Sequence, residues 1–336
     1  MRIVKIACVF LGFFYALAFL ADFIAPYSPL EQNSSAGYAS PSKIHFDFKK
    51  GFYVYSQNFF LDPITLKKSS KEITQNQGGS RYYIKFFTKG KLFQVDKPGY
   101  IYLFGTDRIG RDLFSRLIYG ARPSLSIGFL GVLISFPLAL IYGGIAGFAP
   151  RWIDNLMMRL AEAIMSLPSF YLLIILSAIL PASLSNIERF ALITVILSFI
   201  SWAGLARIIR GQILSIKEKD FIASAQVIGQ NHFMIILKHL LPHTTSLVIV
   251  SATLSVPSFI IGESALSFLG LGINQPDPSW GNILAEGKEL SNILIRPLLL
   301  WVPAILIFIT IFSFNVIGDY LRDKLDPKHI SSDLSN

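Results

Sequence analysis

Two histidines have the spacing of a pair of metal ligands. His239 and His243 are four residues apart, so a helix would present both on one face. Pro242 lies between them and no third ligand is nearby, so we expect solvated or helix-capping histidines instead. The sequence contains no phosphate-binding G-x-x-x-x-G-K-[ST] loop and no H-E-x-x-H pair, and residues 262–265 do not form a G-x-S-x-G turn. The single cysteine, Cys8, excludes an internal disulfide and a cysteine-based zinc site. We therefore predict a non-catalytic chain with no metal and no cofactor of its own.

The composition is that of a membrane protein. Of the 336 residues, 52% are hydrophobic and only 15% are charged, whereas a soluble domain averages about 25% charged. The formal charge of +9 is spread between apolar runs, so it does not form the clustered basic face of a nucleic-acid-binding module. We exclude nucleic acid as a partner and expect lipid as the solvent.

Six apolar runs are each long enough to cross about 30 Å of hydrocarbon as a helix. The runs are Ile6–Ile24, Pro123–Phe148, Leu160–Leu180, Phe190–Ile208, Ser246–Leu269 and Leu298–Ile317. The first could be a cleaved signal peptide, but it continues past its small-residue site at 16–18, so we favour an uncleaved anchor. The predicted fold is an all-α protein with six transmembrane helices.

Lysines and arginines in the short loops set the orientation. If the N-terminus is cytoplasmic, the outer loops hold three of them (Arg189, Lys288 and Arg296). The inner segments then hold twelve: Arg2, Lys5, Arg151, Arg159, Arg207, Arg210, Lys217, Lys219, Lys238, Arg322, Lys324 and Lys328. We therefore expect both termini in the cytoplasm.

This orientation divides the chain into four parts. Residues 1–26 form the first span, 27–122 an extracytoplasmic segment, 123–318 a core with an inner loop at about 213–242, and 319–336 a cytoplasmic tail. Aromatic alternation at 52–55 and 82–87, with a glycine turn at 78–79, predicts a small β-rich insertion between the first two spans. A loosely ordered lysine-rich loop is the alternative.

Several charged residues lie near the ends of the spans. Asp107, Arg111 and Asp112 either brace an outer segment by ion pairs or contact a partner protein. Glu263 is either a gate or pairing residue or an interfacial group, because an ionisable side chain inside the membrane is costly unless it is paired or wetted. Arg207 and Arg210, at the inner end of the fourth run, are expected to anchor at the interface, and the alternative is contact with a cytoplasmic partner.

The inner loop predicts two short helices joined at a glycine. Asp220 stands at an N-cap position, and the apolar residues Phe221, Ile222, Ala225 and Ile228 follow on one face. Gly229 stands where a C′ residue with positive φ is wanted. Asn231 can cap a second helix from His232 to about Leu240, ended by Leu241-Pro242. So short a helix needs its apolar face covered, either by the chain's own spans or lipid, or by a groove on a cytoplasmic partner.

The same residues carry a family resemblance. Ala223-Ser224-Ala225, Gly229 and Leu241-Pro242 resemble the E-A-A…G…L-P signature of the permease subunits of bacterial ABC importers. Ala223 stands where the family usually has Glu, and His239 stands where many members have Ile. Residues 105–122, 263–272, 276–281 and 318–327 are similar to segments of the peptide/nickel importer branch and its C-type subunit, and the long insertion is similar to the Yej-type group.

The resemblance implies a transmembrane permease subunit of an ATP-driven importer of peptides across the inner (cytoplasmic) membrane. It implies a second, B-type permease subunit, two ATPase subunits that bind ATP and Mg²⁺, and an extracytoplasmic substrate-binding protein. It assigns coupling to the ATPases to Asp220, Phe221, Ala223, Ser224, Ala225, Gly229, Leu241 and Pro242. The alternatives are a nickel or microcin-like substrate, an ion-coupled secondary transporter, or a membrane-anchored scaffold that binds through its insertion.

Overall fold

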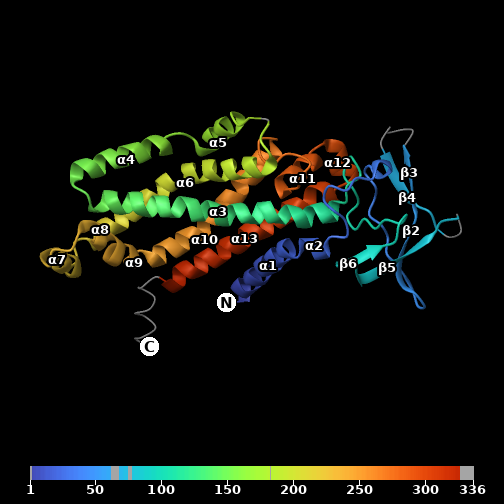
Figure 1. The fold of residues 1–336 in the computed structure, drawn as a ribbon, viewed down its shortest axis with the longest axis horizontal. Coiled ribbons are helices and arrows are strands. Elements are labelled where there is room, and N and C mark those ends of the chain that lie inside the picture. The colour runs from blue at the N-terminus through green and yellow to red at the C-terminus, as the bar shows by residue number, and fades with distance from the viewer. Residues whose placement is uncertain (1, 62–67, 75–77, 182, 326–336) are drawn as a thin grey trace. The chain divides into compact units, whose positions relative to one another are not determined.

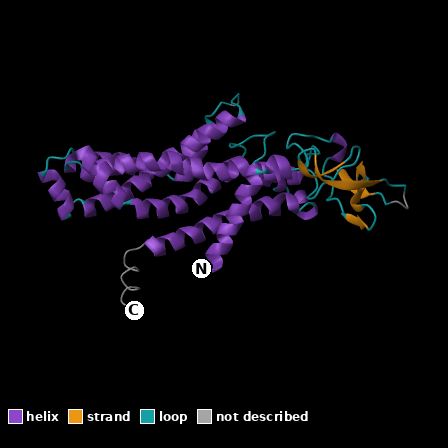
Figure 2. Ribbon diagram, turned by 60° about the horizontal axis from the view of Figure 1, so that its bottom comes forward, coloured by secondary structure: helices purple, strands orange, loops and turns teal. Residues whose placement is uncertain are grey.

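The computed structural model describes residues 2–61, 68–74, 78–181 and 183–325. Its helices are α1 (Arg2–Phe19), α2 (Ala21–Ile24), α3 (Leu113–Phe148), α4 (Arg151–Met165), α5 (Ser169–Ala178), α6 (Asn186–Ile216), α7 (Asp220–Val227), α8 (His232–Ile235), α9 (Leu241–His243), α10 (Thr245–Phe268), α11 (Trp280–Gly287), α12 (Leu290–Ile295) and α13 (Leu298–Leu325). A 3-10 turn, η1, covers Ser34–Ala36, and a π-helical turn, η3, covers Ile236–Leu240. Along the chain, the strands come after α2 and before α3; they can be followed in Figure 1 and are orange in Figure 2.

The membrane-spanning helices match the predicted runs with one difference. Five described helices (α1, α3, α6, α10 and α13) are long and apolar enough to cross a membrane. The run 160–180, expected as one helix, is instead divided between α4 and α5, which meet at 76°. Pro168 causes the break, because it lacks a backbone N–H and stands directly before the first residue of α5. Counting this bent pair as one span gives the six that the sequence predicts.

The described chain divides into two compact units. The first contains residues 1–11, 126–266 and 309–336, and the second contains residues 12–125 and 267–308. Because the boundaries fall inside α1, α3, α10 and α13, these helices contribute to both units. The tail expected at 319–336 continues α13 as far as Leu325, and its remaining residues lie outside the described part of the chain.

Close backbone approach holds the first unit together. A Cβ at Gly143 of α3 would lie 2.5 Å from the carbonyl oxygen of Ala206 in α6, and one at Gly147 would lie 2.8 Å from Ile213 Cβ. Glycine at these two positions lets the helices touch, as small residues commonly do between membrane helices. Beside this contact, the ring of Tyr142 meets that of Trp202 edge to face, with centroids 4.7 Å apart.

The second unit contains the predicted insertion, which is a β structure. Strands β1 (His45–Asp47), β2 (Gly51–Tyr55), β5 (Arg81–Thr88) and β6 (Lys91–Val95) form one antiparallel sheet in the order β1-β2-β5-β6. Strands β3 (Gln57–Leu61) and β4 (Lys68–Glu72) form a second, two-stranded sheet. Both aromatic runs lie within strands of the first sheet, as their alternation predicts.

The two ends of the insertion are bonded to each other. The Ser42 amide donates to the Tyr102 carbonyl at 2.8 Å, and the Thr106 amide donates to the Ala39 carbonyl at 3.1 Å. The Thr106 hydroxyl also accepts from the Ala39 amide at 2.7 Å. The segments that enter and leave the β insertion therefore lie side by side.

On the membrane side of the second unit, α11 is fixed against α3 by a tryptophan. Trp280 is buried, its Nε1–H donates to the Leu117 carbonyl at 3.0 Å, and its backbone amide donates to Ser124 Oγ at 3.0 Å. A capping box between Ser279 and Asn282 begins α11 and sets the direction of this ring.

The close contact of α3 and α6 predicts that Gly143→Ala destabilises the protein. The added methyl meets a backbone oxygen that cannot move aside alone, so we expect a loss of about 1–3 kcal/mol. Gly211→Ala in α6 is the matched control, since nothing lies within 4 Å of the position of its Cβ. Thermal unfolding of the detergent-purified protein measures both variants. An unchanged midpoint for Gly143→Ala would contradict the predicted role of this contact.

Candidate functional site

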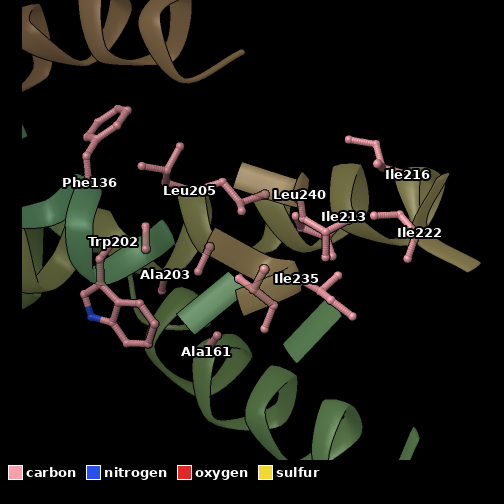
Figure 3. Close-up of a cluster of buried hydrophobic side chains, with 14 of the residues drawn as sticks. Phe136, Ala161, Trp202, Ala203, Leu205, Ile213, Ile216, Ile222, Ile235 and Leu240 are labelled. Carbon is pink, nitrogen blue, oxygen red and sulfur yellow. The ribbon is translucent and has the colours of Figure 1, made fainter. Parts of the chain in front are cut away.

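The inner loop folds as a short helical hairpin attached to the core of the first unit. Buried apolar side chains of α7, α8 and η3 join those of α3, α4 and α6 in one cluster (Figure 3). We call it the hairpin core. It contains Phe136, Ala139, Ala161, Trp202, Ala203, Leu205, Ala206, Ile209, Ile213, Ile216, Ile222, Ala225, Ile235, Ile236 and Leu240.

Helix α7 begins one residue earlier than the sequence predicts. The Lys219 carbonyl accepts the first helical bonds, from Ile222 and Ala223, so Asp220 lies in the first turn. A carboxylate there still interacts favourably with the positive end of the helix dipole. The Ser224 hydroxyl donates to the Asp220 carbonyl at 2.9 Å, so its donor is satisfied within the helix.

The apolar face of α7 is narrower than its sequence pattern indicates. Ile222 is fully buried and Ala225 nearly so, both in the hairpin core. Phe221 lies at the edge, where its ring meets that of His243 at a tilt of 41°, with 4.9 Å between centroids. Ile228, expected on the buried face, is 81% exposed, and its neighbour Val227 is 87% exposed. The prediction for Ile228 is wrong because the buried face is centred on Ile222 and Ala225. The Ile228 amide still donates to the Ser224 carbonyl at 3.1 Å, but its side chain lies about 120° around the helix from that of Ile222.

Gly229 ends α7 in the predicted way. Its φ is +82°, and the Gln230 amide donates to the Ala225 carbonyl at 3.1 Å. This six-residue bond is the one that closes a Schellman motif, with the glycine at C′. The motif turns the chain sharply between α7 and α8, so both can pack on the same core.

The second helix does not stop at Leu241-Pro242. Instead α8 widens into the π turn η3, where the Leu241 amide donates to the Ile236 carbonyl five residues back, and α9 and α10 follow. Pro242 lies in the first turn of α9, where its missing N–H leaves no broken bond. The π turn is how the chain passes this proline without ending the helical path. His239, which stands where many members of the resembled family have Ile, bonds Gln230 Oε1 at 2.8 Å across the hairpin.

The two arginines at the inner end of α6 have different surroundings. Arg210 makes a two-pronged ion pair with Asp154 of α4, from Nε to Oδ1 at 2.8 Å and from Nη2 to Oδ2 at 2.5 Å. Asp154 is buried, so this pair ties α4 to α6. Arg207 is exposed. The sequence did not single out Asp154, whose distance from Arg210 along the chain hides the pairing.

Glu263 is buried within α10. None of its surface is exposed, and it accepts a long bond of 3.5 Å from the Ser264 hydroxyl. The choice between a gate or pairing residue and an interfacial group stays a prediction.

In the second unit, Asp107 and Arg111 form the ion pair that the sequence offers as one alternative. Arg111 Nε lies 2.6 Å from Asp107 Oδ2, and both side chains are buried. Two residues that sequence reasoning missed complete the network. Arg116 of α3 and Glu286 of α11 form an ion pair at 3.3 Å. Each also contacts the first pair: Arg116 lies 3.6 Å from Asp107, and Glu286 lies 3.2 Å from Arg111. The alternating charges fasten the start of α3 to α11.

Asp112 has a separate role at the first turn of α3. Its Oδ2 accepts from the Ser115 amide at 2.8 Å and from the Ser115 hydroxyl at 2.6 Å, which is helix capping. Complete burial raises its pKa to about 7, although the Ser115 bonds act in the opposite direction.

Comparison with known proteins agrees with this geometry. Residues 117–330 match the model of the binding-protein-dependent transport system inner membrane component, and residues 2–41 match the N-terminal transmembrane domain of oligopeptide transport permease C. The chain belongs to this permease family. The permease is 44% identical to the dipeptide transport system permease protein DppC of Bacillus subtilis over 233 residues, 69% of this chain and 70% of the relative.

Two oligopeptide permeases are similarly close. The chain is 44% identical to the oligopeptide transport system permease protein OppC of Haemophilus influenzae over 227 residues, covering 68% of this chain and 70% of that one. It is 42% identical to OppC of Salmonella typhimurium over 225 residues, covering 67% and 72%. Residues 42–116, which contain the six strands, lie between the two matched ranges. The permease is thus a multi-pass inner-membrane transport component with an added β insertion.

The geometry at Gly229 predicts a specific effect of Gly229→Ala. A Cβ there meets no atom within 4 Å, so the cost comes only from the left-handed backbone, about 1 kcal/mol. We expect the permease to insert and fold, while the Gln230 amide exchanges its hydrogen several times faster. Gly204→Ala, equally open but helical, is the control. Equal protection of the Gln230 amide in the wild type and in Gly229→Ala would contradict the Schellman assignment.

Asp112 predicts a pH dependence of the first turn of α3. Folding raises the pKa of this carboxyl, so the protonated form of Asp112 favours the folded state. Its contribution to folding stability is complete below the unfolded pKa of about 4 and is lost as the pH rises through 7. Protection factors of the Ser115 and Arg116 amides should therefore fall between pH 5 and pH 8. Asp112→Asn keeps the capping oxygen and should reduce this slope, leaving the part due to Glu286, whose pKa burial also raises. Asp96→Asn, at an exposed pair with Lys85, is the control and should retain the full slope. An undiminished slope in Asp112→Asn would exclude this carboxyl as the titrating group.

Proposed function

We propose that the permease is the C-type subunit of an ATP-driven importer of peptides. The similarity to dipeptide and oligopeptide permeases supports the substrate class. A nickel ion or a microcin-like conjugate is the narrower alternative that the resemblance leaves open. The substrate reaches the pore from an extracytoplasmic binding protein, and the pore forms between this chain and a second, B-type permease.

The observation that carries the coupling proposal is the uncovered apolar end of α7. Val227 and Ile228 are among the most exposed apolar side chains of the described residues, although the same helix buries Ile222. An isolated pair of exposed aliphatic residues on a fixed hairpin is suited to a hydrophobic groove on a partner. We assign this groove to an ATPase subunit that binds ATP and Mg²⁺.

The other predicted coupling residues lie around this end. Ala223 and Ser224 are exposed on α7, and Phe221 is half-exposed beside them. Because Ala223 replaces the usual Glu of the family, contact at this point is apolar in this permease. Asp220 supplies the nearest negative charge on α7, one turn earlier.

Force on the hairpin reaches the spans through the hairpin core. Ile222 and Ala225 pack in one cluster with residues of α6, and Arg210 ties α6 to α4. Closure of the ATPases on nucleotide would move α7 and favour one of two arrangements of the spans. We assign the hairpin and both termini to the cytoplasm and the β insertion to the outer side, and the distribution of lysine and arginine in the short loops supports this assignment.

The test is labelled-peptide uptake and ATP hydrolysis by the four-component complex in proteoliposomes, with Ile228→Asp as the variant. We expect normal insertion and a loss of at least tenfold in peptide-stimulated ATP hydrolysis, because a carboxylate cannot enter an apolar groove without a large desolvation cost. Ile187→Asp is the matched control, since Ile187 is 82% exposed at the start of α6, and its activity should be unchanged.

Normal coupling in Ile228→Asp would refute the docking assignment. Uptake that persists on a proton gradient after ATP is depleted would refute the ATP-driven importer and favour an ion-coupled secondary transporter. Loss of ATPase subunits from the purified complex of Ile228→Asp, with retention of the B-type permease, would locate the defect at the hairpin.

A further inference from the structure

The four-stranded sheet of the insertion has one face that is only half covered. The strand register places on this face the aromatic and aliphatic residues Phe46, Phe52, Val54, Tyr82, Ile84, Phe86, Phe93 and Val95. The opposite face carries His45, Tyr53, Tyr55, Arg81, Tyr83 and Lys85. The two faces therefore differ in chemistry, the first apolar and the second polar and aromatic.

The covered half of the apolar face packs on segments that adjoin membrane helices. Val54 and Val95 are buried with Ile101, and Tyr27, which follows α2, packs against the same cluster. The ring of Phe93 lies 6.0 Å from that of Phe114, in the first turn of α3. The apolar face is thus directed toward the ends of the spans that enter the membrane.

The remaining half of the face is uncovered and consists of phenylalanine. Phe46 and Phe52 stack at 5.1 Å, Phe52 meets Phe86 at 6.3 Å, and Phe48, in the β1–β2 turn, meets Phe46 at 5.4 Å. All four are at least 44% exposed, and Phe48 is 97% exposed. A contiguous patch of this kind in a well-formed sheet indicates contact with an apolar phase or partner.

A second hairpin places the patch at the level of the membrane surface. The ring of Phe87, 75% exposed at the end of β5, lies 6.2 Å from that of Phe23 in α2, which continues the first membrane helix. Lys91 of the same hairpin donates from Nζ to the Asp22 carbonyl at 2.9 Å. The β5–β6 hairpin therefore lies where α1 and α2 leave the hydrocarbon, and the uncovered face continues away from that point.

The charges around the patch are positive. Lys49 and Lys50 follow Phe48 in the β1–β2 turn, and Lys89 and Lys91 follow Phe87. The acids of these segments are already engaged: Asp47 pairs with Arg81 at 3.3 Å and Asp22 with Arg122 at 2.7 Å. Aromatic rings flanked by lysine are what a surface in contact with anionic lipid requires.

We propose that this face is a lipid-binding surface on the outer leaflet. Phe46, Phe48, Phe52 and Phe86 enter the interfacial region of the bilayer from this face. Phe87, whose φ of +53° takes it out of the strand alternation, enters from the end of the β5–β6 hairpin, and Lys49 and Lys89 contact anionic headgroups. Aromatic side chains at such interfaces are favourable because the ring is apolar yet tolerates the polar boundary. The insertion then lies along the membrane beside the first span, and the opposite face, where Tyr53 and Tyr55 are buried within the protein, does not contact lipid.

Site-directed spin labelling of the full-length permease in lipid nanodiscs tests the proposal. With Cys8 replaced by Ser, single cysteines at Phe48→Cys and Phe87→Cys carry the nitroxide, in discs that contain phosphatidylglycerol. Lys85→Cys, on the opposite face, is the control. We expect the ratio of oxygen to nickel-chelate accessibility to be at least threefold higher at 48 and 87 than at 85.

A second arm tests the charge contribution. Lys49→Glu combined with Lys89→Glu, or discs of phosphatidylcholine alone, should lower this ratio at position 48 by at least twofold. A ratio at 48 and 87 equal to that at 85 would overturn the proposal. So would labels that are immobilised and inaccessible to both reagents, because that result means that a protein covers the face. Spin-label accessibility requires that the permease insert into the disc but not that it transport a peptide. A negative result here is therefore distinguishable from a failure of the proposed transport function.

Discussion

The hairpin core is the contact on which the first unit of the permease depends. Gly143 and Gly147 allow α3 and α6 to touch, and the side chains around that contact leave a place into which Ile222 fits. Without it, α7 would be a two-turn helix in water, which is too short to persist alone. The fixed position of α7 is therefore a property of the spans and not of the loop.

In the second unit, a network of buried ion pairs fixes the start of α3 against α11. Asp107, Arg111, Arg116 and Glu286 alternate in sign at short distances, so each buried group has partners of the opposite charge. Such a network contributes little net stability beyond an apolar alternative, because desolvation opposes the attraction. What it does supply is a defined arrangement, since loss of one member leaves a buried charge unpaired.

Local patterns in the sequence predicted the elements that local physics determines. The φ of Gly229, the aromatic strands and the long apolar helices all follow from residues close together in the chain. Partners far apart were missed: Glu286 is separated from Arg116 by 170 positions, and Asp154 from Arg210 by 56. No periodic pattern in the sequence indicates such distant pairs.

Some local expectations also failed, for a physical reason in each case. Pro242 does not end a helix, because the π turn before it lets the helical path continue. Pro168, in contrast, marks the break between α4 and α5. Both are prolines in apolar surroundings, and the difference depends on what the neighbouring helices allow. Ile228 was expected on the buried face with Phe221 and Ile222, but that face is centred on Ile222 and Ala225, and helical geometry turns Ile228 away from it.

The bonded ends of the insertion have an evolutionary consequence. Because Ser42 meets Tyr102 and Ala39 meets Thr106, the two attachment points of the sheet are neighbours, and a short linker could replace everything between them. Gain or loss of the sheet would then leave the transport core in register. An attachment of this kind lets the sheet be exchanged or lost as one unit, with no change to the helices on either side of it.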